Sequence, residues 1–144
     1  MSQPKSSFVR RLATLTACAV LGAATMASTA AQAQQEFKKK DKYVIYLSLS
    51  YSGNAWQSEA ANVVKALAKT PPYDKSVELR EVISGTDVQA QISAYESMID
   101  AGADGIVSFP ISPTALNRTI KRGCDKGVLF FMYDATVTEP CAYN

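Results

Sequence analysis

The sequence contains no histidine, and this absence removes several kinds of enzyme from consideration. Ser-His-Asp and Cys-His catalytic centres both need an imidazole as the general base. The glycine-rich patterns GxGxxG and GxxxxGK[ST], which bind phosphate groups, are missing as well. Asp87 and Asp134 could form the carboxylate pair of a glycosidase, but nothing in their spacing supports one. We therefore expect a protein that is not an enzyme and that uses no cofactor and no catalytic metal.

Excess charge is lacking too. The formal net charge is +2 at pH 7, and three of the basic residues, Lys5, Arg10 and Arg11, stand close to the N-terminus. The rest of the chain has 12 basic and 13 acidic side chains, a net charge of −1. Binding to a phosphate backbone needs a clear positive excess. We expect no nucleic-acid partner, and the run of lysines at 38–40 is predicted to be a solvated leader.

The N-terminus has the parts of a secretory signal peptide. Behind the three basic residues, an apolar and uncharged stretch covers residues 12–26, and small residues follow up to Ala33. This pattern predicts export and cleavage after Ala33, so that residues 1–33 form the signal peptide. The stretch is shorter than the roughly 20 residues that span a bilayer. A second interpretation stays open, in which residues 15–18 are a lipobox and Cys18 is lipidated.

Only three cysteines are present, and export gives two of them a meaning. If Cys18 leaves with the signal peptide, Cys124 and Cys141 remain, an even number in an oxidising compartment. A disulfide between them would close a loop of about 17 residues, worth about 3 kcal/mol by chain entropy. The alternative is two unpaired thiols. Neither cysteine has a CxxC partner, and no histidine could complete a zinc site.

After the leader, the sequence alternates between two periodicities. Four apolar, β-prone runs predict strands, at residues 43–50, 77–84, 105–110 and 128–133. Between them, apolar residues at helical spacing predict helices that begin near Trp56, Asp87 and Pro113, the last as a first-turn proline. Gly102 and Gly123 are expected to end the second and third helices. The order β-α-β-α-β-α-β predicts an α/β fold with an open doubly wound parallel sheet.

Ligands of open α/β sheets bind outside the carboxyl ends of the strands. Polar or aromatic residues follow each predicted strand at that edge: Ser52, Asn54, Trp56, Asp87, Ser112 and Asp134. Hydroxyl, amide and carboxylate groups suit a solute whose own hydroxyls both donate and accept hydrogen bonds. Helix N-termini add free backbone N–H groups, and an indole can stack on the apolar face of a sugar ring. These six residues are the predicted ligand-binding residues.

Each of these residues also has a purely structural interpretation. Ser52 and Asn54 could only cap the first helix, and Asp87 could only cap the second. Trp56 could pack beneath its loop instead of facing a ligand. Asp134 ends a strand that reads as buried, where an unpaired carboxylate would be costly, and this favours a ligand contact.

Several spaced residues together resemble one family. Asp87-x-x-x-Gln91, Ile99, Gly102-x-Asp104-x-Ile106 and Pro110 follow one another at the spacing found in periplasmic sugar-binding proteins of ABC transporters, the ribose/galactose-type group. The resemblance continues through residues 115–116 and the last predicted strand. It covers residues 43–134.

The resemblance implies that two similar lobes close over one sugar and that the closed form docks on a membrane permease. It implies further that Asn54 and Trp56 contact the sugar and that Asp134 holds its hydroxyl groups. Ala55 stands where the family often has proline, and Ser112 where it often has aspartate. Residues 34–144 would be the N-terminal lobe, with the second lobe absent, so we expect a truncated version of a longer protein.

Two functions therefore stay open. The first is a periplasmic solute-binding component of sugar uptake, with a small sugar and an inner-membrane permease as partners. The second is a sensor of the same fold that passes a bound sugar or autoinducer signal to a membrane receptor. Because closure over a ligand needs two lobes, we expect weak or absent sugar binding by this chain alone.

Overall fold

The computed structural model describes residues 39–144, so the predicted signal peptide and Cys18 lie outside the described residues. None of the helices in the described range is long and apolar enough to cross a bilayer. The elements follow in the order β1 (Tyr43–Leu49), α1 (Ala55–Ala68), α2 (Tyr73–Ser76), β2 (Val77–Ile83), α3 (Val88–Asp100), β3 (Gly105–Ser108), α4 (Asn117–Asp125) and β4 (Leu129–Met132). The predicted alternation is confirmed, with the four-residue α2 as an addition.

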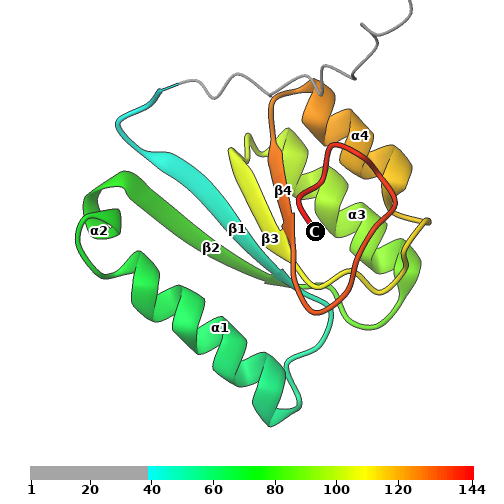
Figure 1. The fold of residues 1–144 in the computed structure, drawn as a ribbon, viewed down its shortest axis with the longest axis horizontal. Helices are drawn as coiled ribbons and strands as arrows, with labels where there is room; N and C mark the ends of the chain where they lie inside the picture. Colours follow the sequence, from blue (N-terminus) through cyan, green and yellow to red (C-terminus); the bar gives the residue numbers. More distant parts are fainter. Residues whose placement is uncertain (1–38) are drawn as a thin grey trace, which may run out of the picture. The chain divides into compact units, whose positions relative to one another are not determined.

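The four strands form one parallel sheet in the order β2-β1-β3-β4 (Figure 1). Helix α1 lies on one face of the sheet, and α3 and α4 lie on the other. The predicted α/β class and open doubly wound parallel sheet are therefore confirmed. Since every strand runs in the same direction, all four carboxyl ends meet at one edge of the sheet.

The α3/α4 face holds the larger core. Alternate residues of β1, β3 and β4 point toward it, among them Tyr46, Ile106 and Phe130, and they pack against Tyr95 and Ile120 from the two helices. The other face has a smaller buried cluster of Leu47, Leu49 and Ala61, where α1 contacts β1 and β2.

Two predicted helix boundaries are wrong. Pro113 does not open a helix; residues 113–116 form turns, and α4 begins at Asn117. Gly123 does not end that helix, which continues to Asp125, and the left-handed residue beyond it is Gly127 with φ 88°. A glycine inside α4 is explained by packing, because a Cβ at Gly123 would lie 2.6 Å from the Phe130 ring. At Gly102 the prediction holds, with φ 80° directly after the end of α3.

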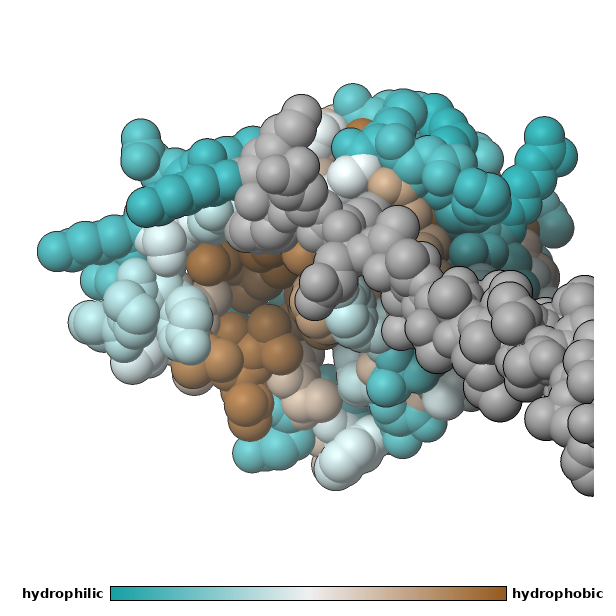
Figure 2. Space-filling model, turned by 45° about the horizontal axis from the view of Figure 1, so that its top comes forward, coloured by the Kyte–Doolittle hydropathy of each residue, from teal (hydrophilic) through white to brown (hydrophobic). Residues whose placement is uncertain are grey.

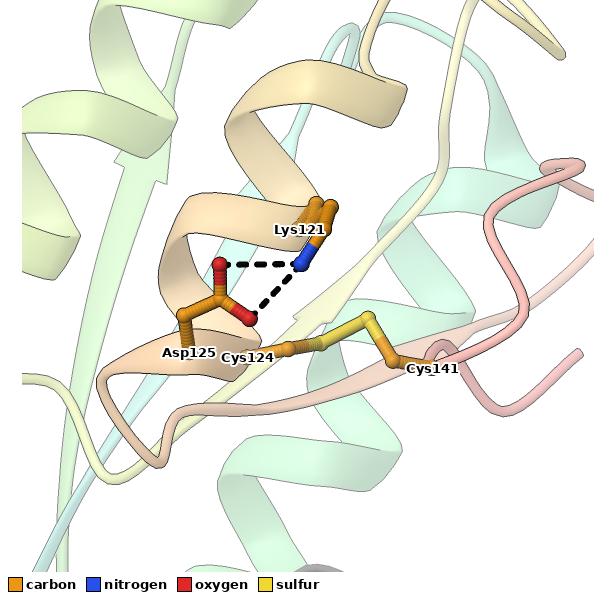
Figure 3. Close-up of a disulfide and its surroundings, with 4 residues drawn as sticks. All are labelled: Lys121, Cys124, Asp125 and Cys141. Atoms are coloured by element: carbon orange, nitrogen blue, oxygen red, sulfur yellow. Dashed lines mark hydrogen bonds and ion pairs between the residues drawn. A yellow bond between two sulfur atoms is a disulfide. The ribbon is translucent and has the colours of Figure 1, made fainter. Parts of the chain in front are cut away.

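The predicted disulfide joins Cys124 at the end of α4 to Cys141 (Figure 3). It ties the last residues of the chain to the rest of the fold, where Tyr143 forms a parallel bridge with Phe131 and their rings stack. The alternative of two unpaired thiols is therefore not what the structure shows. The exposed Lys121–Asp125 ion pair drawn beside the bridge contributes little, because solvent screens it.

Candidate functional site

The candidate site is the edge of the sheet at which the strands end, called the rim below. It consists of the loops that follow β1, β2, β3 and β4: residues 50–54, 84–87, 109–116 and 133–138. Hydrogen bonds continue the sheet into these loops, from Ser84 N to Leu49 O at 2.8 Å and from Tyr133 N to Ser108 O at 3.1 Å. All six predicted residues lie in these loops or, for Trp56, in the first turn of α1.

Asn54 has the capping role that the sequence allowed. Its Oδ1 accepts a hydrogen bond from Gln57 N at 2.8 Å, and its backbone is extended as an N-cap requires. The side chain is exposed, and its two amide hydrogens remain as donors toward solvent. Ser52 is exposed beside it, and its carbonyl accepts from the Ser58 hydroxyl. Capping and a ligand contact are therefore compatible at this loop.

Asp87 and Ser112 accept similar hydrogen bonds where the chain enters α3 and the turn before α4. Asp87 Oδ1 accepts from Ala90 N at 2.8 Å and caps α3. Ser112 Oγ accepts from Ala115 N at 3.1 Å, which shapes the turn that leads to α4. Each of these side chains satisfies a backbone donor at a point where the chain turns away from the rim, so the loops keep their shape without a ligand.

Asp134 differs from the sequence-based expectation in its burial. It is exposed, whereas the strand pattern suggested a buried carboxylate, and its backbone is left-handed with φ 63°. The reason is that β4 ends at Met132, so the chain has already turned outward. Asp134 Oδ2 accepts from Gln57 Nε2 at 3.3 Å, and the other carboxylate oxygen is left for a further donor.

Trp56 does not pack beneath its loop, because its side chain is 62% exposed. It lines a groove of about 360 Å³ along α1, whose other walls are mainly apolar: Glu59, Ala60, Val63, Val64, Val107 and Tyr133. Figure 2 shows apolar side chains gathered in a patch on the face that it presents. The packing interpretation of Trp56 is wrong. Its ligand contact stays a prediction, since the groove runs along the helix and touches the rim at Tyr133.

Sequence reasoning missed two glutamines that support the rim. Gln91, in α3, bridges the loop after β3: its Nε2 donates to Phe109 O at 2.8 Å and its Oε1 accepts from Ile111 N at 3.1 Å. Gln57, in α1, lies between Asp134 and the Tyr133 hydroxyl, which donates to its Oε1 at 3.2 Å. Both side chains are buried. For Gln57 the only sequence signal was a polar residue on the inner face of its helix, whereas Gln91 also belonged to the Asp87-x-x-x-Gln91 motif of the resemblance.

Beneath the rim, two tyrosines have raised pKa values. Burial raises the pKa of Tyr95 to about 12, and its hydroxyl donates to Ser108 Oγ at 2.7 Å. Ser108 in turn donates to Ser48 O at 3.0 Å, which links α3, β3 and β1. Burial, and then the negative charge of Asp134, raise the pKa of Tyr133. Both hydroxyls therefore stay neutral donors at physiological pH.

Residues 39–144 contain no group of three or more His, Cys, Asp or Glu side chains placed to hold a metal ion. The chemistry offered at the rim is instead that of hydrogen bonding. The described loops present an amide at Asn54, hydroxyls at Ser52 and Ser112 and carboxylates at Asp87 and Asp134, with no Lys or Arg side chain among them.

One family model matches most of this chain, and several solved structures share its fold. Residues 45–144 match the family model described as "Periplasmic binding protein domain". Among solved structures, a solute-binding protein of an ABC transporter from Thermobispora bispora is 28% identical, with a TM-score of 0.62 over 71% of this chain and 33% of its own. A periplasmic ribose ABC transporter protein from Conexibacter woesei is 22% identical, with a TM-score of 0.61 over 71% and 33%.

A third solved structure belongs to a signalling protein. The fructose-binding periplasmic domain of a hybrid two-component system is 14% identical, with a TM-score of 0.62 over 69% of this chain and 32% of that one. The chain thus spans about a third of the length of the structures it resembles. The search of curated proteins found no match.

Proposed function

The chain belongs to the periplasmic binding protein domain family, and from this premise we propose that it is one lobe of an extracytoplasmic sugar-binding protein that serves an ABC-type transporter. The family and the similar structures are substrate-binding proteins rather than enzymes, which agrees with the lack of histidine. The proposed lobe is residues 34–144, exported to the periplasm by the signal peptide predicted at 1–33.

The observation that carries the proposal is the composition of the rim. Four loops from one parallel sheet bring Asn54, Asp87, Ser112 and Asp134 to the same edge, and two of these residues cap helices whose N-termini face it. A sugar hydroxyl can donate to either carboxylate while it accepts from the Asn54 amide. Carboxylates without a neighbouring cation favour a neutral polyhydroxylated ligand over an anionic one.

The similar structures support a sugar as the ligand class. The protein from Conexibacter woesei is a periplasmic ribose ABC transporter protein, one from Actinobacillus succinogenes has D-allose bound, and one from Clostridium phytofermentans has β-D-glucose bound. In the proposed mechanism, the rim holds one side of such a sugar and a second lobe closes over the other. The closed form would then be the partner of the permease.

A second candidate function has one observation in its favour, the likeness to the fructose-binding domain of a two-component system. In that role the same rim would bind a sugar or autoinducer and report it to a membrane receptor. The two candidates share the rim and differ in the partner. Genes for a permease and an ATPase beside this one would favour transport, and a neighbouring receptor kinase would favour sensing.

NMR titration of the ¹⁵N-labelled mature chain with D-ribose, D-glucose and D-allose tests the proposal. Because only one lobe is present, we expect a Kd in roughly the millimolar range or weaker, with shifts at the amides near Asn54, Asp87, Ser112 and Asp134. The substitution Asp134→Asn should weaken these shifts. The matched control is Asp41→Asn, exposed just before β1 at the opposite edge. Shifts confined to residues away from the rim would contradict the proposal.

A further inference from the structure

The two buried glutamines are the unusual feature of the lobe. Gln57 is 4% exposed and Gln91 is 0% exposed, although an amide in a protein interior is costly unless it is hydrogen-bonded. Each one bonds through both ends of its amide, and each reaches a rim loop rather than its own helix. They come from opposite sides of the sheet, Gln57 from α1 and Gln91 from α3.

Gln91 makes two hydrogen bonds to the loop after β3, one as donor and one as acceptor. Its NH₂ group meets the carbonyl of Phe109, and its carbonyl meets the N–H of Ile111. Pro110, between them, has no N–H of its own. If the amide were turned over, its oxygen would face the Phe109 carbonyl and its NH₂ group would face the Ile111 N–H, so only one orientation is allowed. The loop that carries Ser112 is therefore fixed by a side chain rather than by a neighbouring strand.

Gln57 makes a similar pair of hydrogen bonds to the two residues after β4. Its Nε2 donates to Asp134 Oδ2, and its Oε1 accepts from the Tyr133 hydroxyl. Asp134 has a left-handed backbone, which a non-glycine residue adopts at a cost. The bond from Gln57 offsets part of that cost and holds one carboxylate oxygen, and the other is left for a further donor.

We propose that Gln57 and Gln91 are positioning residues for ligand binding: they keep the loops after β3 and β4 in the shape that receives a sugar before the sugar arrives. They act through Asp134 and through the loop that carries Ser112, since their own side chains are buried. The inference rests on the proposed function for the nature of the ligand. Holding the loops in advance lowers the conformational entropy that binding would otherwise cost.

The test replaces each amide side chain by a shorter apolar one of similar volume, in Gln57→Leu and Gln91→Leu. The matched control is Gln89→Leu, which changes the same residue type on the exposed side of α3. Hydrogen exchange of the Ile111 amide should become on the order of tenfold faster in Gln91→Leu, because one hydrogen bond is lost. In Gln57→Leu, NMR relaxation of the backbone amides should show increased motion at Asp134. The control should leave both unchanged.

The second readout is sugar binding, which a merely structural role would not change. At a temperature where all variants are folded, the apparent Kd for D-glucose should rise on the order of fivefold in both variants and stay unchanged in Gln89→Leu. Tyr133→Phe removes only one of the bonds to Gln57 and should have a smaller effect. If a leucine variant fails to fold, the Ile111 amide and the Gln91 NH₂ group of the unchanged chain should still exchange more slowly than the exposed N–H groups of Gly53 and Thr86 in the rim loops.

The outcomes separate this inference from the proposed function. Rapid exchange of the Ile111 amide in the unchanged chain would overturn the positioning role. So would leucine variants that fold and bind glucose as tightly as the unchanged chain does. Loop motion in the variants, together with sugar-induced shifts that lie only away from the rim in the unchanged chain, would keep the positioning of the loops and overturn the sugar as their ligand.

Discussion

The two faces of the sheet are built from the same strands and differ greatly in how much they bury. Within residues 39–144, the α3/α4 face has a core of 13 buried residues, whereas the α1 face has three. Neighbouring residues of β4 show the contrast: Phe130 is fully buried against α3 and α4, and Phe131, which points the other way, is 42% exposed. An apolar strand is thus no guarantee of burial on both sides.

The two faces therefore differ in what they contribute: one buries a core, and the other leaves apolar side chains exposed. Helices α3 and α4 seal their face, whereas α1 contacts chiefly β1 and β2. Parallel sheets are usually covered on both faces, and here the groove beside α1 keeps Trp56 and Val63 more than half exposed. We infer that most of the free energy of unfolding comes from the α3/α4 side, and the predictions below test that inference.

The largest effect is expected from removing a ring on the sealed face. Phe130→Ala should lower the free energy of unfolding by about 3–5 kcal/mol, because it leaves a cavity against Tyr95 and Gly123. Phe131→Ala, one residue further on, should cost less than about 1.5 kcal/mol, since that ring is already partly in water. Urea denaturation of both variants gives the comparison. Equal losses would show that the two faces contribute alike.

The next effect concerns the disulfide, whose two cysteines belong to the core of the α3/α4 side. Cys124→Ala with Cys141→Ala, or reduction of the unchanged protein, should lower the free energy of unfolding by about 3 kcal/mol, from the 17-residue separation. Unfolding in the presence and absence of dithiothreitol measures it. The double variant should show no further response to reductant, and a response of equal size there would assign the loss to something other than the bridge.

The smallest effect is expected from removing a helix cap on either side of the sheet. Asn54→Ala removes the cap of α1 and Asp87→Ala that of α3, and each should cost about 1 kcal/mol. Because α1 has less packing to hold it, the loss at Asn54 should appear as local opening. Hydrogen exchange would then increase in the first turn of α1 before the whole chain unfolds, whereas α3 should open only with the global transition.

Much of this fold follows from the sequence because its signals are periodic. Apolar runs such as residues 43–50 and 128–133 gave the strands, and their polar ends gave the position of the rim. The short α2 has too few residues for a periodic pattern. The start of α4 was misplaced because a proline such as Pro113 suits both a first helical turn and the turn before it.

The parts of the site that escaped prediction depend on tertiary contacts. A glutamine on the inner face of a helix gives no sign of its partner, and the Asp87-x-x-x-Gln91 motif does not show that Gln91 bonds to Phe109 in the loop after β3. The exposure of Asp134 depends on where β4 stops and on a left-handed residue, which no pattern of hydrophobicity reports. Whether the six predicted residues contact a sugar remains a prediction, since their position at one edge is compatible with it and does not test it.

The Cys124–Cys141 bridge has a consequence for the timing of maturation. The segment after Asp134 returns to α4, where the sulfurs join, and Asn144 closes it again through Val137, accepting from its N–H at 2.8 Å and donating to its carbonyl at 3.1 Å. Thiols stay reduced in the cytosol and pair only after export. If the chain is exported as proposed, a precursor still inside the cell lacks the disulfide, one of the two links that hold this loop, and forms it only after crossing the membrane.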